Sequence, residues 1–297
     1  MGSCPTARPR RSKQLPLPAT WGKLEPSLPP PMAHPLTDLP RRTGRSVRRF
    51  LEVRGDLAHL VGRTVRGWLF MDFHRFRVVN EQVRLQIKFT GIDALALVVA
   101  VGMGLGAVTV IQAFTQLSAL GAEAYIGPIL VLIVIRELGP LLAAILVIGR
   151  SATAIAAELA SMKLNDEVDA LEAFGIDPHQ YLLLPRALGA VVSLFALMAC
   201  FDAAALAGGF LVARLRFGLP LGPFLDGVRG ALTYADLWIT PLKAFLFGGA
   251  IAFHAAYYGL AVHRSQTEVP QAVTRTVVAC FGVVFVLDGL IAALVYG

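Results

Sequence analysis

The stretch that decides the fold is residues 126–157, which read IGPILVLIVIRELGPLLAAILVIGRSATAIAA. Its only charged side chains are Arg136, Glu137 and Arg150, and most of the others are apolar. A helix needs about 20 such residues to cross the roughly 30 Å of hydrocarbon in a bilayer. The stretch is longer than that, which predicts a membrane-spanning helix that tilts or projects into the cytoplasm.

Four further apolar runs are long enough to span a membrane, at 91–117, 181–213, 237–262 and 276–296. Of the 297 residues, 56% are hydrophobic and only 16% are charged, and the mean hydropathy is +0.63. Soluble proteins carry about 25% charged residues, so the composition argues against a soluble enzyme. We predict an all-α, polytopic membrane protein with five transmembrane helices preceded by an amphipathic interfacial helix.

Small residues at close intervals predict where these helices pack tightly. The pairs are Gly102 with Gly106, Gly208 with Gly209, and Gly248 with Gly249.

Motifs for covalent or metal chemistry are absent from the sequence. The three cysteines, Cys4, Cys200 and Cys280, offer neither a disulfide framework nor a zinc cluster. The six histidines lack metal-ligand spacing, and no phosphate-binding loop or nucleophile–base motif is present. We therefore expect no metal, no bound cofactor and no ATP hydrolysis by this chain. Transport against a gradient needs energy from another subunit or from an ion.

The positive charge is concentrated before the first span. Residues 1–90 hold 17 of the 27 Lys and Arg but only 6 of the 20 Asp and Glu. Because Lys and Arg resist translocation, this predicts a cytoplasmic N-terminus and, after five spans, an outer C-terminus. The loop between the third and fourth spans fits an outer location poorly, since it carries Arg214, Arg216 and Arg229. No nucleic-acid-binding motif accompanies the basic segment, so we expect no nucleic-acid partner.

Two segments precede the membrane domain. Residues 1–46 contain 10 of the 18 prolines and no apolar periodicity, which predicts a disordered or targeting segment, or an extension upstream of a true start at Met32. Residues 47–90 form a basic region in which apolar side chains recur at three- and four-residue steps over 47–69. That pattern predicts a helix lying in the membrane interface, the alternative being a helix packed on a soluble partner.

The connection between the second and third spans is punctuated as one short helix. Residues 163–178 read KLNDEVDALEAFGIDP, in which Asn165 is a candidate N-cap and Gly175 a candidate helix stop. Val168, Leu171 and Phe174 fall on one face of a helix over 163–175. The other faces carry the acids Asp166, Glu167, Asp169 and Glu172.

The acidity of this helix decides what it can touch. A negative cytoplasmic leaflet repels it, so it needs either water or a protein partner. Docking into a cleft of a motor subunit and a merely solvated loop helix both remain open on spacing alone.

Charged side chains inside the predicted spans are costly unless they are paired or hydrated. Glu137 of the second span and Lys243 of the fourth are natural partners, and Pro140 lets the second span bend beside them. Arg136, Glu137 and Lys243 form either a polar cluster lining a substrate cavity or an ion-pair group that fixes helix register.

Four other polar residues lie within the spans or at their inner ends. Arg150 is placed to extend to a lipid phosphate, and Glu158 lies near the inner end of the second span. For Asp202 and Asp288 we expect structural hydrogen bonds.

Residues from about 80 to 297 resemble the MlaE (YrbE) family of lipid-transport permeases. The matching motifs include Arg136-Glu137-Leu138-Gly139-Pro140, Gly149-Arg150, Asp169-Ala170-Leu171-Glu172, Gly175-Ile176-Asp177-Pro178 and Leu287-Asp288. Residues 1–46 fall outside the resemblance. We take 91–297, which contains the five predicted spans, as the permease domain.

The resemblance implies the permease of an ATP-binding-cassette transporter for phospholipid or a related lipid. It further implies a second copy of the chain, an ATPase subunit that holds ATP and Mg, an MCE-domain protein, and in some systems a STAS-domain protein. The helix at 163–175 is similar to the coupling helix that meets the ATPase, and Arg136, Glu137 and Lys243 are similar to a polar cluster beneath the lipid cavity. The expected location is a bacterial inner membrane, with an organelle membrane as the alternative.

A rival hypothesis follows from the intramembrane carboxylates. An ion-coupled secondary transporter would use Glu137, Asp202 and Asp288 as a proton relay and would need no ATPase.

Overall fold

The computed structural model describes residues 73–122, 125–262 and 265–296, with the single residues 55 and 62. Apart from those two residues, the predicted segments at 1–46 and 47–69 lie outside the described residues. Every regular element within the described ranges is helical, which confirms the all-α prediction.

Five helical spans are long and apolar enough to cross a membrane. They run over Asn80–Leu117, Ile126–Leu164, Tyr181–Phe217, Tyr234–Leu260 and Gln266–Val295. Each contains nearly all of a predicted run, and the first and the fifth begin well before it. The chain is therefore a multi-pass membrane protein with five spans.

Several spans are assembled from consecutive helical pieces. The first joins α2 (Phe73–Ile87), η1 (Lys88–Ile92) and α3 (Asp93–Leu117). The second joins α4 (Ile126–Leu130), the π-helical segment η4 (Val131–Leu138), α5 (Gly139–Val147), η5 (Ile148–Ala152) and α6 (Thr153–Leu164). The third consists of η6 (His179–Leu183) and α8 (Leu184–Phe217), the fourth of α10 (Tyr234–Leu260), and the fifth of η7 (Gln266–Glu268) and α11 (Val269–Tyr296).

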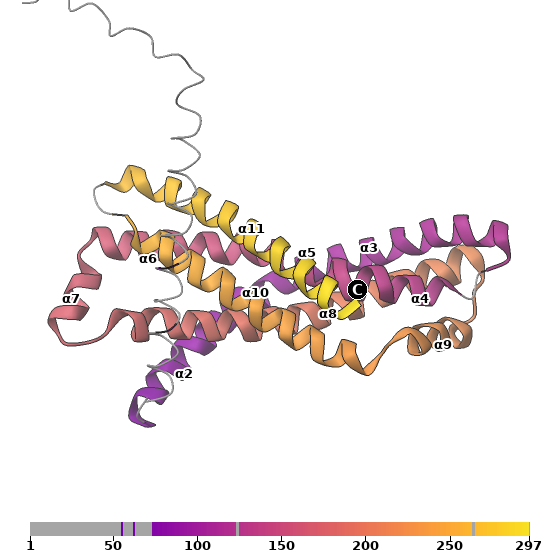
Figure 1. Ribbon diagram of the computed structural model, residues 1–297, viewed down its shortest axis with the longest axis horizontal. Helices are drawn as coiled ribbons and strands as arrows, with labels where there is room; N and C mark the ends of the chain where they lie inside the picture. The colour runs from indigo at the N-terminus through magenta and orange to yellow at the C-terminus, as the bar shows by residue number, and fades with distance from the viewer. Residues whose placement is uncertain (1–54, 56–61, 63–72, 123–124, 263–264, 297) are drawn as a thin grey trace, which may run out of the picture. The chain divides into compact units, whose positions relative to one another are not determined.

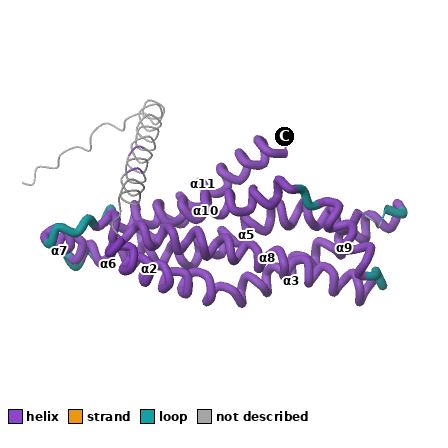
Figure 2. The backbone as a smooth tube through the Cα atoms, turned by 90° about the horizontal axis from the view of Figure 1, so that it is seen from below, coloured by secondary structure: helices purple, strands orange, loops and turns teal. Residues whose placement is uncertain are grey.

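Two short helices mark opposite ends of the bundle. Helix α7 (Glu167–Ala173) connects α6 to the third span at one end, and α9 (Leu221–Ala231) lies beside the turn from α3 to α4 at the other (Figure 1). The turned view in Figure 2 shows the same separation. The two connections therefore face different sides of the membrane.

Glycines let α3 and α8 approach closely. A methyl group added at Gly106 would collide with the backbone of Ala205, and one at Gly208 would collide with the backbone of Met103. Such contacts bring two backbones together where lipid offers no hydrophobic driving force. The prediction was wrong for Gly249, because a side chain there would meet open space.

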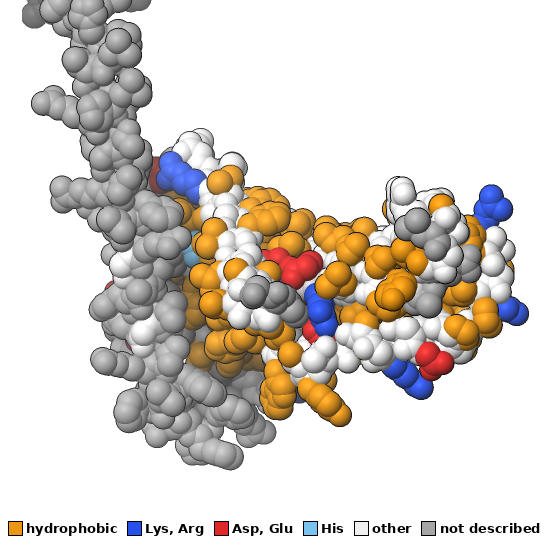
Figure 3. Space-filling model, turned by 45° about the vertical axis from the view of Figure 1, so that its right-hand side comes forward, with side chains coloured by type: hydrophobic (Ala, Val, Ile, Leu, Met, Phe, Trp, Pro, Cys, Tyr) orange, Lys and Arg blue, Asp and Glu red, His pale blue; other side chains and the backbone are white. Residues whose placement is uncertain are grey.

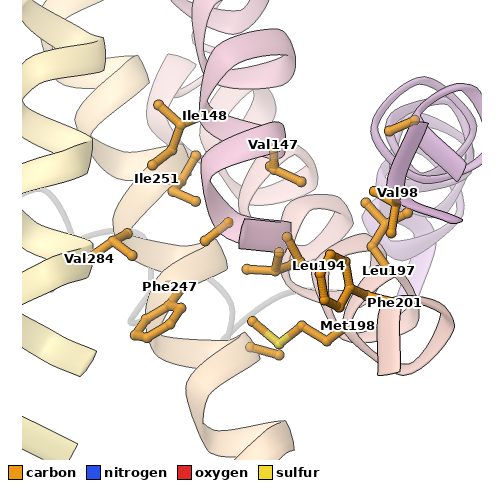
Figure 4. Packing of buried hydrophobic residues seen from close by; sticks show 14 of the residues in the cluster. Val98, Val147, Ile148, Leu194, Leu197, Met198, Phe201, Phe247, Ile251 and Val284 are labelled. Atoms are coloured by element: carbon orange, nitrogen blue, oxygen red, sulfur yellow. The ribbon is translucent and has the colours of Figure 1, made fainter. Parts of the chain in front are cut away.

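The buried core is centred on α8. The α8 side chains Leu194, Leu197 and Phe201 pack with apolar residues of α3, α5 and α10, and Val284 of α11 joins the same core beside α10 (Figure 4). Other members of this core are Val98, Val147, Phe247 and Ile251. This packing holds the second, fourth and fifth spans in fixed positions, so their charged side chains meet at defined places.

Candidate functional site

The amino group of Lys243 is the centre of a buried charge group. The side chain is only 1% exposed, and its Nζ lies 2.7 Å from Asp288 Oδ1 and 3.5 Å from Glu137 Oε2. The predicted pairing of Glu137 with Lys243 is confirmed. The prediction for Asp288 was incomplete, because this carboxylate forms the shorter of the two ion pairs with Lys243.

A proline supplies the third partner of Lys243. Pro140 has no backbone N–H, so the carbonyl of Arg136 loses the donor that an α-helix would provide four residues later. Lys243 Nζ donates to this carbonyl at 2.7 Å. The irregular π-helical geometry of η4 thus becomes part of the Lys243 ion-pair group, and π-helical segments often occur at functional sites.

The side chain of Arg136 points to a different partner. Its Nε lies 2.9 Å from Asp236 Oδ1 and its Nη2 donates to Asp236 Oδ2 at 3.0 Å. The same Nη2 also donates to the Ala231 carbonyl at 3.1 Å and to Thr233 Oγ1 at 3.2 Å. The predicted three-residue cluster therefore divides into two groups, joined by the backbone of Arg136.

Asp236 was missed from the sequence, although a local signal was present. Thr233 and Asp236 have the spacing of a capping box, and the Thr233 N–H donates to Asp236 Oδ2 at 2.8 Å. Asp236 therefore closes the first turn of α10 and binds Arg136 with the same carboxylate. This geometry ties the start of the fourth span to the first third of the second.

A small pocket lies between the two charge groups, with room for roughly one water molecule. It is lined by Ile135, Arg136, Pro140, Asp236, Ile239, Thr240 and Lys243. The surface view shows acidic and basic side chains gathered between hydrophobic patches in the middle of one face (Figure 3). Charged side chains therefore reach the surface in a region where the surrounding side chains are apolar.

Asp202 does not make the structural hydrogen bond predicted from the sequence. Its Oδ1 is buried, and no hydrogen-bond partner for it is found within the described ranges. The carboxylate lies against Gly139, where an added methyl group would collide with Oδ1 and with the Val134 carbonyl. Gly139 therefore leaves the space that Asp202 occupies beside the bend in the second span.

Arg150 and Glu158 each form an ion pair with a residue of another span. Arg150 Nη2 lies 3.1 Å from Asp93 Oδ2, and its guanidinium stacks 5.3 Å from the ring centre of Phe89. Glu158 Oε1 accepts from Arg186 Nη2 at 2.8 Å. Arg150 thus joins the first and second spans, in place of the contact with lipid phosphate predicted from the sequence.

The connecting helix α7 differs from its prediction in how it starts. Asn165 ends α6, and Asp166 adopts a left-handed conformation, with φ of 58°, as the residue preceding α7. Asp tolerates this region better than most residues. The N-cap predicted at Asn165 is therefore wrong, because Asp166 takes that position. The predicted helix stop is confirmed, because Gly175 has a φ of 73°.

The apolar face of α7 is only partly used inside the protein. Val168 is buried and Leu171 packs against the core, but Phe174 lies beyond the last helical residue and is 82% exposed. Lys163 forms an ion pair with Asp169 at 2.5 Å. The protein therefore covers Val168 and Leu171 but leaves Phe174 exposed.

Comparison with known proteins connects this arrangement to one family. Residues 83–294 match the family model described as Permease MlaE. A probable ABC transporter permease protein of Rickettsia typhi is 32% identical over 211 residues, which cover 71% of this chain and 82% of the relative. The intermembrane phospholipid transport system permease protein MlaE of Haemophilus influenzae is 30% identical over 213 residues, with the same two coverages. The chloroplastic protein TRIGALACTOSYLDIACYLGLYCEROL 1 of Arabidopsis thaliana is 28% identical over 209 residues, which are 70% of this chain and 59% of the relative.

Proposed function

The chain belongs to the MlaE permease family, and from that premise we propose that it moves phospholipid or a related lipid between the inner membrane and a tunnel formed by an MCE-domain protein. As the permease of an ATP-binding-cassette system it acts with a separate ATPase subunit. ATP and Mg are held by that subunit, and this chain contributes the path for the lipid.

The observation that carries the proposal is a match that spans all five membrane helices. The relative from Haemophilus influenzae is named for intermembrane phospholipid transport, and its similarity covers 82% of its own length. The family match over residues 83–294 includes both charge groups and α7, so it supports a whole permease rather than a shared helical fragment.

In the mechanism that we propose, ATP binding switches a dimer between two conformations. A second copy of the chain pairs with the first, and a lipid occupies the cavity between them. ATP binding draws the two ATPase subunits together and moves both α7 helices, and the cavity then closes and expels the lipid. The permease therefore works through different affinities of its two shapes for lipid. A STAS-domain protein that binds the ATPase fits the same assembly.

The proposed orientation places α7 and the N-terminus in the cytoplasm of a bacterium, with the chain in the inner membrane. The support is the excess of Lys and Arg in residues 1–90 and the acidity of the α7 region. The three arginines between the third and fourth spans remain the feature that fits this orientation least well. The chloroplastic relative makes an organelle membrane the alternative location.

The ion-coupled alternative is not favoured by the geometry. Glu137 and Asp288 are both paired with Lys243, which holds them in place as counter-ions. No hydrogen bond or ion pair within the described ranges joins Asp202 to either of them. A proton relay needs a connected series of exchangeable groups, and these three carboxylates do not form one.

Reconstitution separates the two transport mechanisms. The chain is placed in vesicles with its ATPase and MCE-domain protein, and transfer of a fluorescent phospholipid is followed. The proposal predicts transfer that requires ATP, stops with vanadate and persists with a protonophore. Transfer that ignores ATP and collapses with the protonophore would establish the ion-coupled mechanism instead.

A further inference from the structure

Asp202 is an acid inside the membrane domain that the proposed transport mechanism does not use. Its Oδ1 is buried on α8, and no donor reaches this oxygen within the described ranges. A methyl group added at Gly139 would collide with Oδ1 and with the Val134 carbonyl oxygen. The acid therefore faces the backbone of the second span at the bend before Pro140, where a carbonyl lies beside it.

The bend leaves two carbonyls without their regular backbone donors. The Gly139 N–H donates to the carbonyl five residues earlier, and Pro140 has no N–H. The Ile135 carbonyl therefore lacks the donor four residues later and also the donor five residues later. The Arg136 carbonyl loses its α-helical donor to the same proline and binds Lys243 instead. One freed carbonyl thus has a side-chain donor, and the other needs one.

The freed Ile135 carbonyl lies on the side of the second span that meets Asp202. In a helix each carbonyl lies beside the residue four positions later, which places the Ile135 carbonyl beside Gly139. By the same geometry the Arg136 carbonyl lies beside Pro140, which lines the small pocket next to α10. Gly139 instead faces Asp202. Each freed carbonyl therefore has one polar side chain near it, a lysine from α10 or an aspartate from α8.

No cation balances a charge on Asp202. Helix α8 packs against α3, η4, α5 and α10. The titratable residues of these four elements are Asp93, Arg136, Glu137, Tyr234, Asp236, Lys243, His254, Tyr257 and Tyr258, and those of α8 itself are Arg186, Cys200, Arg214 and Arg216. None of them forms an ion pair with Asp202 within the described part of the chain. An ionised Asp202 would be an unpaired charge in an apolar interior, beside the negative end of a carbonyl dipole, which is strongly unfavourable.

We propose that Asp202 is a neutral carboxylic acid whose O–H donates to the Ile135 carbonyl and so positions the bend of the second span. Protonation turns the acid into a donor, which the carbonyl attracts, whereas the carbonyl would repel a carboxylate. Lys243 and Asp202 then hold the bend through one freed carbonyl each. The bend carries Arg136 and Glu137, so its position sets the geometry of both charge groups. This role depends neither on the lipid nor on the ATPase.

Infrared spectroscopy of the detergent-solubilised full chain tests the protonation state. At neutral pH, the difference spectrum between the wild type and Asp202→Asn should contain the carbonyl-stretch band of a protonated carboxylic acid, and that band should shift in heavy water. The matched control is Asp226→Asn, which changes an exposed acid of α9 and should remove only carboxylate bands. A carboxylate band in place of the acid band at Asp202 would overturn the proposal.

Thermal unfolding as a function of pH gives a second test of the proton. The folded chain keeps a proton that the unfolded chain releases in the ordinary range of an aspartic acid, so the wild type loses stability as the pH rises above that range. Asp202→Asn carries no such proton. The unfolding temperature of the wild type should therefore fall relative to that of Asp202→Asn, by about 3–5 °C per pH unit. A difference that stays constant with pH would show an ionised Asp202 and contradict the proposal.

A comparison of two uncharged variants tests the hydrogen bond itself. Asp202→Asn keeps an N–H donor for the Ile135 carbonyl, whereas Asp202→Leu leaves that carbonyl without one. Asp202→Leu should unfold about 3–8 °C below Asp202→Asn at every pH. Equal unfolding temperatures of these two variants would remove the hydrogen bond from the account of the bend.

Discussion

Two lysines of this chain form similar ion pairs in very different surroundings. Lys243 is 1% exposed beside Asp288, whose side chain is 6% exposed, whereas Lys163 and Asp169 are 25% and 55% exposed. Separating a buried pair leaves a charge without water, while the members of an exposed pair are readily hydrated. From this difference we infer that the Lys243 group stabilises the packing of the membrane-spanning helices. The charges around α7 remain exposed and can contact a partner.

The largest effect is expected at Lys243. Lys243→Met leaves Glu137 and Asp288 without their cation, which should cost about 3–5 kcal/mol of unfolding free energy. Thermal or denaturant unfolding in detergent measures the loss. The double variant Lys243→Met/Asp288→Asn should recover a large part of it, because one uncompensated carboxylate disappears. A double variant less stable than Lys243→Met alone would contradict the ion-pair description.

A smaller effect is expected at the second charge group. Asp236→Asn keeps the size of the side chain but removes the charge that binds Arg136, which is more exposed than Lys243. The loss should be about 1–3 kcal/mol, since Asn still accepts hydrogen bonds. Unfolding of Asp236→Asn beside Asp226→Asn, an acid of α9, separates this contact from general charge effects. Equal stability of the two variants would argue against the Arg136 contact.

Substitution of Pro140 tests the coupling between the second and fourth spans. Pro140→Ala supplies a backbone N–H that can pair with the Arg136 carbonyl, so Lys243 loses exclusive use of that acceptor. A double-mutant cycle with Lys243→Met should give a coupling energy of about 1 kcal/mol. Strict additivity would mean that the carbonyl contact contributes no stability.

The smallest effect is expected at the exposed pair. Lys163→Met should change the unfolding free energy by less than about 1 kcal/mol, and that change should shrink as salt is added. The same unfolding experiment at low and high salt measures it. A loss comparable to that of Lys243→Met would erase the contrast between the two regions.

The sequence predicts the five spans and the pairing of Glu137 with Lys243. Long apolar runs are a strong signal, and a charge within one of them needs a partner on another helix. The direction of the Arg136 side chain was not predictable, because the π-helical segment η4 rotates residues relative to an ideal α-helix. An ideal helix over residues 163–175 also misses the break between α6 and α7, where Asn165 ends one helix and left-handed Asp166 precedes the next.

Lipid transfer and ATP hydrolysis, measured on the same vesicles, test the central claim most directly. The comparison uses the wild-type complex, Phe174→Ala, and the partly neutralised Lys243→Met/Asp288→Asn. The account predicts that Phe174→Ala at limiting ATPase lowers both activities together. It predicts that the double variant, once its unfolding curve shows that it is folded, still hydrolyses ATP but loses most lipid transfer. Wild-type lipid transfer by both variants would contradict the account.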